Sequence, residues 1–357
     1  MSKVVHGGNI EELSRKYKLD KDKLIDFSAN INPIGINTNI KLEMIKALEE
    51  VERYPDITYY DLKLSISEFE KINIEDLVLG NGAAEVIFNL VRALKPKKVL
   101  IPAPTFGEYE EAILSINGDI EYYILEEHNN WNISEDILNY IKEDIDMIFI
   151  CNPNNPTGVL TNKDLIRNIA KKALETNTTV VVDESFLDFI EASDNYTSLD
   201  LIEEYKNIFV IKSMTKIFAI PGIRIGYGIS KNEEILEKIV EVSVPWNVNV
   251  VAEKAAIIAL KEEEYIKETI NYIGKEKNYL FSELMKINKI KVFKPSVNFI
   301  MFKTLENIDL KKIMLKENLV IRSCGNYKGL SDNYYRIAVR TRKENEKFIC
   351  TLKSLIK

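Results

Sequence analysis

The sequence predicts an α/β fold, in which a large domain with a mostly parallel sheet flanked by helices is joined to a smaller α+β domain. Helical segments alternate with strand-like runs and can supply the crossovers of a parallel sheet. After Pro245 the pattern changes to long helices followed by mixed strands and helices. Apolar runs without alternation, typical of strands buried on both faces, lie at 98–101, 147–151, 179–182 and 208–211.

The chain has 357 residues, enough for about two domains. We expect the large domain at 41–248 and the small domain at 1–40 together with 249–357. Pro33 and Gly35 break any long element near the N-terminus, so this segment is expected to cross the sheet edge and join the C-terminal unit. Helical patterns lie near 40–52, 84–94, 250–287 and 309–317, and further strand-like runs at 291–303, 320–324 and 334–340.

Composition excludes several classes of protein. With 46% hydrophobic and 29% charged residues the chain is a globular protein. Its net charge of −7, with basic residues dispersed, lacks the footprint of a nucleic-acid binder, so no nucleic-acid partner is expected. The 3 cysteines are far apart and the histidines number only 2, which argues against a disulfide framework and a metal site.

The location of the protein is also an expectation from the sequence. The N-terminus has no apolar leader core, and no apolar stretch approaches the ~18 residues of a membrane span. We therefore expect no membrane partner. Cysteine usage fits a reducing compartment, which indicates the cytoplasm.

The most informative segment is SMTKIFAIPGIRIGY, residues 213–227, directly after a predicted strand. It places Ser213, Lys216 and Arg224 on one connection leaving the sheet. The four residues after Lys216 are apolar, so they would desolvate its ammonium, lower its pKa and prepare it for imine formation. Serine β-lactamases share the Ser-x-x-Lys spacing, but their Lys-Thr-Gly motif is missing here.

Two further polar residues follow predicted strands. Asp183, in VVVDESF, ends a buried strand and would point into the crevice where α/β proteins bind ligands. A helix cap or a surface turn would explain the same aspartate equally well. Asn155, in CNPNNPTG, carries an amide that can donate to a ligand oxygen, although such runs often form only turns.

A glycine-rich turn precedes the helical pattern that starts near Ala83 and Ala84, in LGNGAAEVIFNLVRAL. Free backbone N–H groups at a helix start bind phosphate. A dinucleotide-binding loop is the competing interpretation, but Glu85 stands where the third glycine belongs and no strong strand is predicted before it. Phe106, in IPAPTFGEY, follows a strand and can stack on a planar ring or serve as a core aromatic.

Taken in order, the phosphate loop, aromatic, amide, carboxylate, lysine and arginine form one constellation. It resembles the fold-type I pyridoxal-phosphate enzymes of the class I and II aminotransferase group over nearly the whole chain. The resemblance implies pyridoxal 5′-phosphate as cofactor, bound covalently by Lys216, with Asp183 at the pyridine nitrogen, Asn155 at the ring hydroxyl and Phe106 stacked on the ring. It also implies that the cofactor phosphate lies on Ala83, Ala84, Ser213 and Arg224.

Tyr54, in ERYPD, resembles the tyrosine of this group that reaches the phosphate in the neighbouring subunit. The resemblance therefore implies a homodimer with shared active sites.

Two subfamilies compete within the group: histidinol-phosphate aminotransferases and the threonine-phosphate decarboxylases of cobalamin biosynthesis. Phe186 stands where the aminotransferases commonly carry a tyrosine. The other features that resemble the decarboxylases are VHGGNIEELSRKYK from Val5, DFSANINPIG at 26–35, VIRSCGNYKGL at 320–330 and YYRIAVRT at 334–341. The expected reaction is decarboxylation of L-threonine O-3-phosphate to (R)-1-amino-2-propanol phosphate, a carbon–carbon lyase reaction; aminotransfer is the alternative.

The expected substrate carries a carboxylate and a phosphate, and guanidinium forks suit both groups. By resemblance Arg336 meets the carboxylate alongside Asn155, while His6, Gly7, Asn30 and Arg322 line the rest of the substrate site. A non-catalytic regulator is a remote alternative, because about forty N-terminal residues leave no room for a DNA-binding domain and the acidic charge argues against one.

Overall fold

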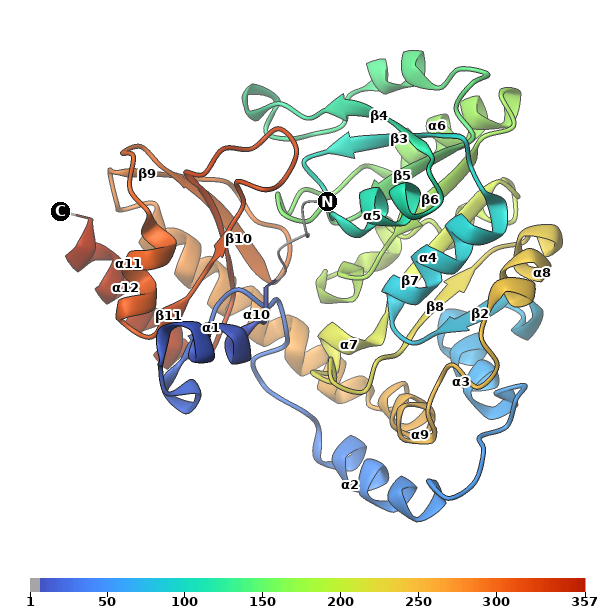
Figure 1. Cartoon of the computed structure of the whole chain (residues 1–357), viewed down its shortest axis with the longest axis horizontal. Coiled ribbons are helices and arrows are strands. Elements are labelled where there is room, and N and C mark those ends of the chain that lie inside the picture. The colour runs from blue at the N-terminus through green and yellow to red at the C-terminus, as the bar shows by residue number, and fades with distance from the viewer. Residues whose placement is uncertain (1–6, 357) are drawn as a thin grey trace.

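The computed structural model describes residues 7–356, and its centre is a seven-stranded sheet (Figure 1). Its strands, in spatial order, are β2 (Leu77–Gly80), β8 (Gly226–Ile229), β7 (Ile208–Ser213), β6 (Thr179–Asp183), β5 (Met147–Cys151), β3 (Lys98–Ala103) and β4 (Asp119–Ile124). Strand β8 is antiparallel to both neighbours, and the other pairs are parallel. The predicted runs at β3, β5, β6 and β7 are confirmed as strands buried on both faces.

Helices cover both faces of this sheet, as predicted. Helices α4 (Ala83–Leu94), α5 (Glu108–Ser115) and α8 (Glu233–Val242) pack on one face, together with the side chain of Val181. Val180 and Val182 belong to the core on the opposite face, which includes residues of α6 (Lys163–Glu175). Because side chains alternate along a strand, the side chain of Asp183 points to the same face as that of Val181, the face that α4 covers.

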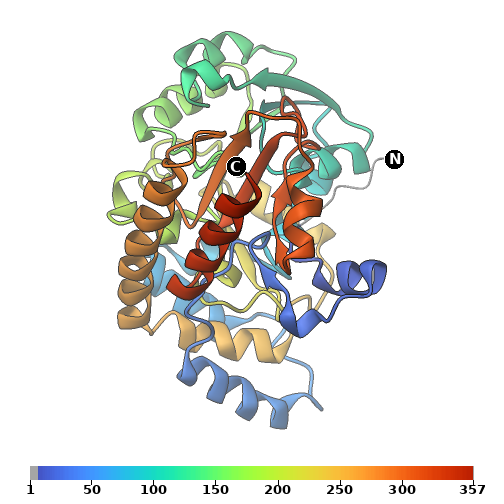
Figure 2. The ribbon, with the colours of Figure 1, turned by 90° about the vertical axis from the view of Figure 1, so that its left-hand side faces the viewer.

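A second, four-stranded sheet lies in the C-terminal part of the chain. Its antiparallel strands, in order, are β12 (Arg322–Ser323), β13 (Tyr334–Ala338), β10 (Phe299–Thr304) and β9 (Ile290–Val292). Helices α10 (Glu263–Leu284) and α12 (Arg342–Leu355) contact each other, and both lie on the side that faces the viewer in Figure 2. Helix α11 (Leu310–Lys316) contacts α12.

The N-terminal segment is attached to this C-terminal unit. After α1 (Ile10–Tyr17), strand β1 (Ile25–Asp26) pairs in parallel with β11 (Leu319–Val320). The carbonyl of Phe27 then accepts from the Ala338 N–H at 2.8 Å. This pairing brings residues 26–30 to the gap between the two sheets.

Helices α2 (Thr38–Ala47), α3 (Tyr60–Glu70) and α9 (Val250–Ala259) pack together at the lower end of the molecule in Figure 1. None of the helices within residues 7–356 is both long and apolar enough to span a membrane.

The structure refines two expectations about elements. The helical pattern at 250–287 is confirmed and consists of two helices, α9 and α10, separated at residues 260–262. A strand of four residues, β2, precedes the glycine turn at Gly82, where the sequence predicts no strong strand. The dinucleotide-loop interpretation still fails, because β2 pairs only with the antiparallel strand β8, whereas that motif requires a parallel βαβ unit.

Candidate active site

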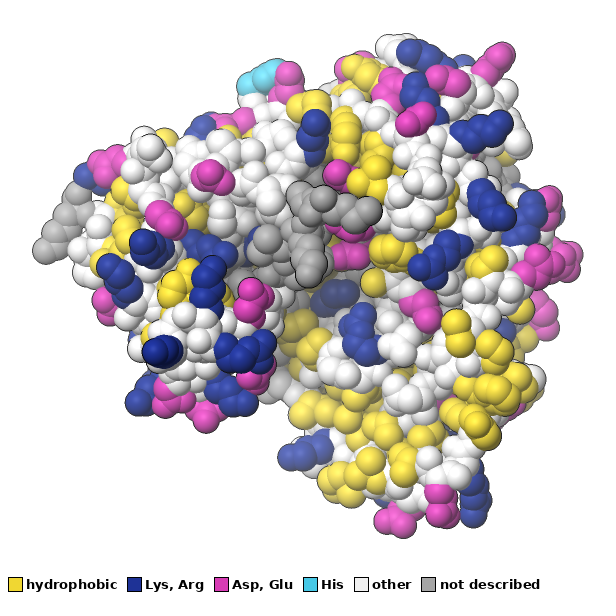
Figure 3. All heavy atoms as spheres, in the orientation of Figure 1, with side chains coloured by type: hydrophobic (Ala, Val, Ile, Leu, Met, Phe, Trp, Pro, Cys, Tyr) yellow, Lys and Arg dark blue, Asp and Glu magenta, His cyan; other side chains and the backbone are white. Residues whose placement is uncertain are grey.

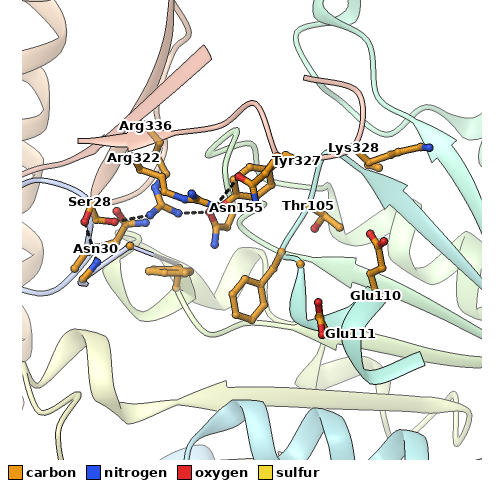
Figure 4. Close-up of a pocket in the computed structure, with 18 of the residues that line it drawn as sticks. Ser28, Asn30, Thr105, Glu110, Glu111, Asn155, Arg322, Tyr327, Lys328 and Arg336 are labelled. Atoms are coloured by element: carbon orange, nitrogen blue, oxygen red, sulfur yellow. Dashed lines mark hydrogen bonds between the residues drawn. The ribbon is translucent and has the colours of Figure 1, made fainter. Parts of the chain in front are cut away.

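Two cavities meet between the sheets. The larger cavity, of about 1190 Å³, is lined by the N-terminal segment, by residues of β3 and α5 of the large sheet's layer, and by residues of the four-stranded sheet (Figure 4). The smaller, of about 120 Å³, lies against the start of α4 and the end of β6. They share Phe106, Asn155, Phe186 and Lys216 as lining residues. A molecule bound in the small cavity would therefore be in reach of one bound in the large cavity.

The small cavity collects the residues that the sequence assigned to the cofactor, with the exception of Tyr54. They are Ala83, Ala84, Phe106, Asn155, Asp183, Ser213, Lys216 and Arg224. These residues come from five separate segments of the chain, and the parallel sheet brings them together at the carboxyl ends of its strands.

Lys216 lies on the single-turn helix α7 (Met214–Ile217), directly after β7. Its Nζ donates to Ser213 Oγ at 2.9 Å. Burial lowers the pKa of Lys216 to about 8; Asp183 opposes this shift and the Arg224 charge adds to it. A substantial fraction of the amine is therefore neutral near physiological pH, which is the form that attacks a carbonyl carbon.

Asp183 is fixed at the end of β6 by two donors. The Ser185 N–H donates to Oδ1 at 2.9 Å and the Tyr109 hydroxyl donates to Oδ2 at 2.7 Å. Burial raises the pKa of Tyr109 well above its ordinary value, and the Asp183 charge adds to the shift, so the phenol remains a donor. Sequence reasoning did not single out Tyr109, which is three positions after Phe106 and contacts its ring edge-on at 5.6 Å.

The small cavity also has a group of donors that suits an anion. A Cβ on Gly82 would stand 2.2 Å from Nη2 of Arg224, and one on Gly226 would stand 2.4 Å from the backbone nitrogen of Ala83. Only glycine at both positions lets the guanidinium and the start of α4 approach this closely. With the Ser213 hydroxyl, they present donors that suit a phosphate group.

The large cavity holds two arginines without a carboxylate partner among the described residues. Arg336 donates to Asn155 Oδ1 and, at 2.7 Å, to the carbonyl of Ser28, while its Nε has no partner. Arg322 donates to Asn326 Oδ1 at 2.8 Å. Figure 4 shows both guanidinium groups beside Asn155. Two buried cations with neutral partners predict an anionic ligand, because an unpaired buried charge is costly.

Asn30 and Gly7, two other sequence-predicted substrate residues, also line the large cavity. The buried Asn30 Oδ1 has no partner in the described part of the chain. Gly7 lies against Ser28, whose carbonyl oxygen a Cβ would approach to 2.1 Å, and the Gly8 N–H donates to Ser28 Oγ at 2.8 Å. Ser28, which sequence reasoning missed, thus connects the N-terminal glycines to Arg336. His6 lies outside the described residues.

Tyr54 does not lie in either cavity of its own chain. It is 81% exposed, and its ring packs on Trp246 with a centroid distance of 4.7 Å. Phe186, in contrast, lines both cavities. Its ring centroid is 5.5 Å from Lys216 Nζ, and it packs edge-on against Phe299.

Comparison with known proteins gives a consistent match. The family model for aminotransferase class I and II matches residues 22–352. A threonine-phosphate decarboxylase from Salmonella typhimurium is 33% identical over 98% of this chain and 96% of its own length. A putative threonine-phosphate decarboxylase from Caldanaerobacter subterraneus is 37% identical over 99% and 95%, respectively.

A solved structure of a histidinol-phosphate aminotransferase from Clostridium acetobutylicum is also similar. It is 38% identical, covers 93% of this chain and 99% of its own, and superposes with a TM-score of 0.87. Fold and site together define a pyridoxal-phosphate-dependent enzyme of the fold-type I class. The chain belongs to the class I and II aminotransferase family. The lysine, the carboxylate and the anion-binding helix start of the small cavity fit the aldehyde, ring nitrogen and phosphate of this cofactor.

Proposed function

We propose that the enzyme decarboxylates L-threonine O-3-phosphate to (R)-1-amino-2-propanol phosphate, a step of cobalamin biosynthesis. The observation that carries this proposal is the pair of buried arginines beside the cofactor pocket. Arg336 and Arg322 are 5% and 6% exposed, and no carboxylate among the described residues pairs with either. A substrate with one carboxylate and one phosphate supplies both missing anions.

The proposed arrangement assigns one anion to each arginine. Arg336 donates to Asn155, which also lines the cofactor pocket, so its guanidinium is the one nearer the reacting carbon. It would hold the carboxylate. Arg322 lies next to Asn326 and over the ring of Tyr327, at 5.2 Å from the ring centroid, and would hold the phosphate. Asn30, whose buried side-chain oxygen has no partner among the described residues, lines the same cavity.

When bound, pyridoxal phosphate supplies an electron sink for the electron pair left at the α-carbon. The residues of the chain then decide which bond breaks. Ser213, Arg224 and the start of α4 would hold the phosphate end, and Asp183 would pair with the ring nitrogen. Arg336 holds the substrate carboxylate and thereby fixes the orientation of its bond to the α-carbon. After carbon dioxide leaves, a proton from Lys216 Nζ would replace it at that carbon.

Histidinol-phosphate aminotransfer is the second candidate, and the similarity to the solved Clostridium acetobutylicum aminotransferase favours it. Both reactions use the same cofactor contacts. Histidinol phosphate has a phosphate but no carboxylate, so in that half-reaction Arg336 would lack its anion. Position 186 also argues against this candidate, because it holds a phenylalanine where the aminotransferases commonly have a tyrosine.

We further propose a cytoplasmic homodimer. Apolar side chains gather at the lower right of the molecule in Figure 3, over the α2, α3 and α9 region of Figure 1. The exposed apolar residues of α2, of the segment from α2 to the start of α3, and of the segment before α9 are Leu42, Ile45, Leu48, Val51, Tyr54, Ile57, Tyr60, Val244 and Trp246. A contiguous exposed apolar surface marks an interaction site. A second copy is its proposed occupant, because Tyr54, the residue expected to complete the partner's phosphate site, is one of these residues and packs on Trp246, another of them.

The proposal is tested by comparing three substrates on the purified enzyme. We expect decarboxylation of threonine phosphate with a kcat/KM at least a hundredfold above that for threonine, because threonine leaves Arg322 without an anion. Histidinol phosphate with 2-oxoglutarate should give only slow aminotransfer. Efficient aminotransfer from histidinol phosphate, without carbon dioxide from threonine phosphate, would instead establish the second candidate.

A further inference from the structure

A second group of buried charges lies behind the cofactor pocket, on the other face of the large sheet. Its centre is Lys212, the residue before Ser213 on β7, which is 4% exposed. The Lys212 Nζ lies 3.3 Å from Asp188 Oδ1, 3.6 Å from Glu184 Oε2 and 3.6 Å from Glu70 Oε1. Tyr227 donates its hydroxyl proton to Glu70 Oε1 at 2.5 Å.

This cluster joins the carboxyl ends of two strands that carry cofactor residues. Glu184 directly follows Asp183 at the end of β6, and its backbone N–H donates to the Ile211 carbonyl of β7 at 2.8 Å. Because side chains alternate along a strand, Asp183 and Ser213 face the small cavity while Lys212 faces the opposite side. Lys212 and Ser213 are therefore adjacent residues whose side chains lie on opposite faces of the same sheet.

The Glu184 end of the cluster is held firmly. Glu184 is fully buried, and its carboxylate accepts from Thr197 Oγ1 at 2.8 Å and from the Ser198 N–H at 2.6 Å. Burial raises the pKa of Glu184 and is opposed chiefly by the Lys212 charge. Without Lys212, the carboxylates of the cluster would lose their cation in a low-dielectric site.

A cavity adjoins the polar cluster and the helix that follows β7. A cavity of about 520 Å³, lined by Glu70, Asp188, Lys212 and Tyr227, opens beside the cluster. Met214 and Ile217 of α7, the helix that carries Lys216, line the same cavity. The ion pairs of Lys212 therefore add directional contacts at a junction that is also held by apolar packing and strand pairing.

We propose that Lys212 is a positioning residue for the cofactor site: its ion pairs with Glu184 and Asp188 hold the ends of β6 and β7 so that Asp183 and Ser213 keep the separation that pyridoxal phosphate requires. Lys212 does not contact the small cavity itself. The inference depends on the cofactor and not on the reaction, so it holds for decarboxylation and for aminotransfer. A failure of the proposed substrate would leave it standing.

The test compares Lys212→Met with Lys212→Arg and with the control Lys231→Met. Lys231 is the control because it also bridges two carboxylates, Asp76 at 2.9 Å and Glu203 at 2.8 Å. It follows the C-terminal end of β8, whereas Gly226, which packs on the start of α4, is at the N-terminal end of that strand. The measurements on the holoenzymes are the dissociation constant for pyridoxal phosphate and the pH midpoint of the cofactor's visible absorption. The melting temperature of each apoprotein reports stability separately.

We expect Lys212→Met to weaken cofactor binding at least tenfold and to shift the pH midpoint, and Lys212→Arg to restore both. Lys231→Met should lower the melting temperature without changing either cofactor readout. If Lys212→Met does not fold, Glu184→Gln replaces it, because the amide keeps an acceptor for Ser198 while it weakens the attraction to Lys212. Unchanged cofactor affinity and pH midpoint in a folded Lys212→Met or Glu184→Gln protein would overturn the proposal.

Discussion

Arg322 and Arg336 stand directly opposite each other in the antiparallel pair of β12 and β13. Like charges in opposed positions of a sheet repel and destabilise it. Their side-chain partners, Asn326 and Asn155, are neutral. Anions bound between or beside the two guanidinium groups would offset this repulsion. This relationship supports the proposed doubly anionic substrate.

The two arginines should make different contributions. Arg322→Ala should reduce kcat/KM for threonine phosphate more than for threonine, by on the order of 2 to 5 kcal/mol, because the phosphate is left without its cation. Arg336→Ala should weaken both substrates, since both have the carboxylate. Steady-state kinetics checks this, with Arg340→Ala as control, because Arg340 pairs with Glu344 at 2.8 Å outside both cavities. Equal losses for both substrates in the Arg322 variant would remove its phosphate role.

Lys216 should react with the cofactor in its neutral form. Because burial lowers the pKa of Lys216 to about 8, the rate at which pyridoxal phosphate is bound covalently by the apoprotein should rise with pH and reach half its maximum near pH 8. The reason is that the protonated amine, which predominates below this pH, is not a nucleophile. Stopped-flow absorbance measures the rate. A midpoint near the ordinary lysine value of about 10.4 would contradict the account.

Lys216→Ala should abolish both activity and the covalent link while leaving the fold intact. Borohydride reduction followed by mass spectrometry detects the link, and circular dichroism checks the fold. A reducible adduct with another lysine in this variant would show that the assignment to Lys216 is wrong.

Tyr109 should stabilise the protein through Asp183. Tyr109→Phe leaves Asp183 Oδ2 without its donor, so the free energy of unfolding of the apoprotein should fall by roughly 1–3 kcal/mol. The cofactor should still bind, because Asp183 remains. Urea unfolding monitored by fluorescence gives the change, and Tyr140→Phe is a control at a half-buried tyrosine of the same chain. An unchanged unfolding free energy would mean that the Tyr109 hydroxyl contributes nothing.

Phe186→Tyr should supply a donor near the ring hydroxyl of the cofactor. The added hydrogen bond should lower the pH midpoint of the cofactor's visible absorption by an amount equivalent to about 1 kcal/mol. The variant should not become an efficient histidinol-phosphate aminotransferase, because the arginine pair is unchanged. A spectroscopic titration of both proteins decides the first point, and an identical midpoint would show that position 186 does not face that oxygen.

Much of the large domain's architecture could be predicted from the sequence because β5 and β6 are buried on both faces and read as continuous apolar runs. Strand β8 could not, since its GYGI sequence holds two glycines that are needed for close packing against Ala83 and Phe209. The separation of α9 from α10 has no glycine or proline to mark it.

The cofactor residues could be predicted because each follows a strand or opens a helix in a recognisable segment. The contacts between them could not. Tyr109 reaches Asp183 across 74 positions of sequence. The opposition of Arg322 and Arg336 depends on strand register, which the composition of the two segments does not determine. Likewise, nothing in the sequence places Lys212 among three carboxylates from two separate segments, one that holds Glu70 and one that holds Glu184 and Asp188.

The most direct test of the proposed activity is a reaction of the holoenzyme with threonine phosphate labelled with carbon-13 in its carboxylate. The account predicts labelled carbon dioxide and aminopropanol phosphate in equal amounts over many turnovers, with the cofactor remaining in its aldehyde form. Conversion of the cofactor to its amino form with the label retained in a keto acid would contradict it, and would identify the enzyme as an aminotransferase.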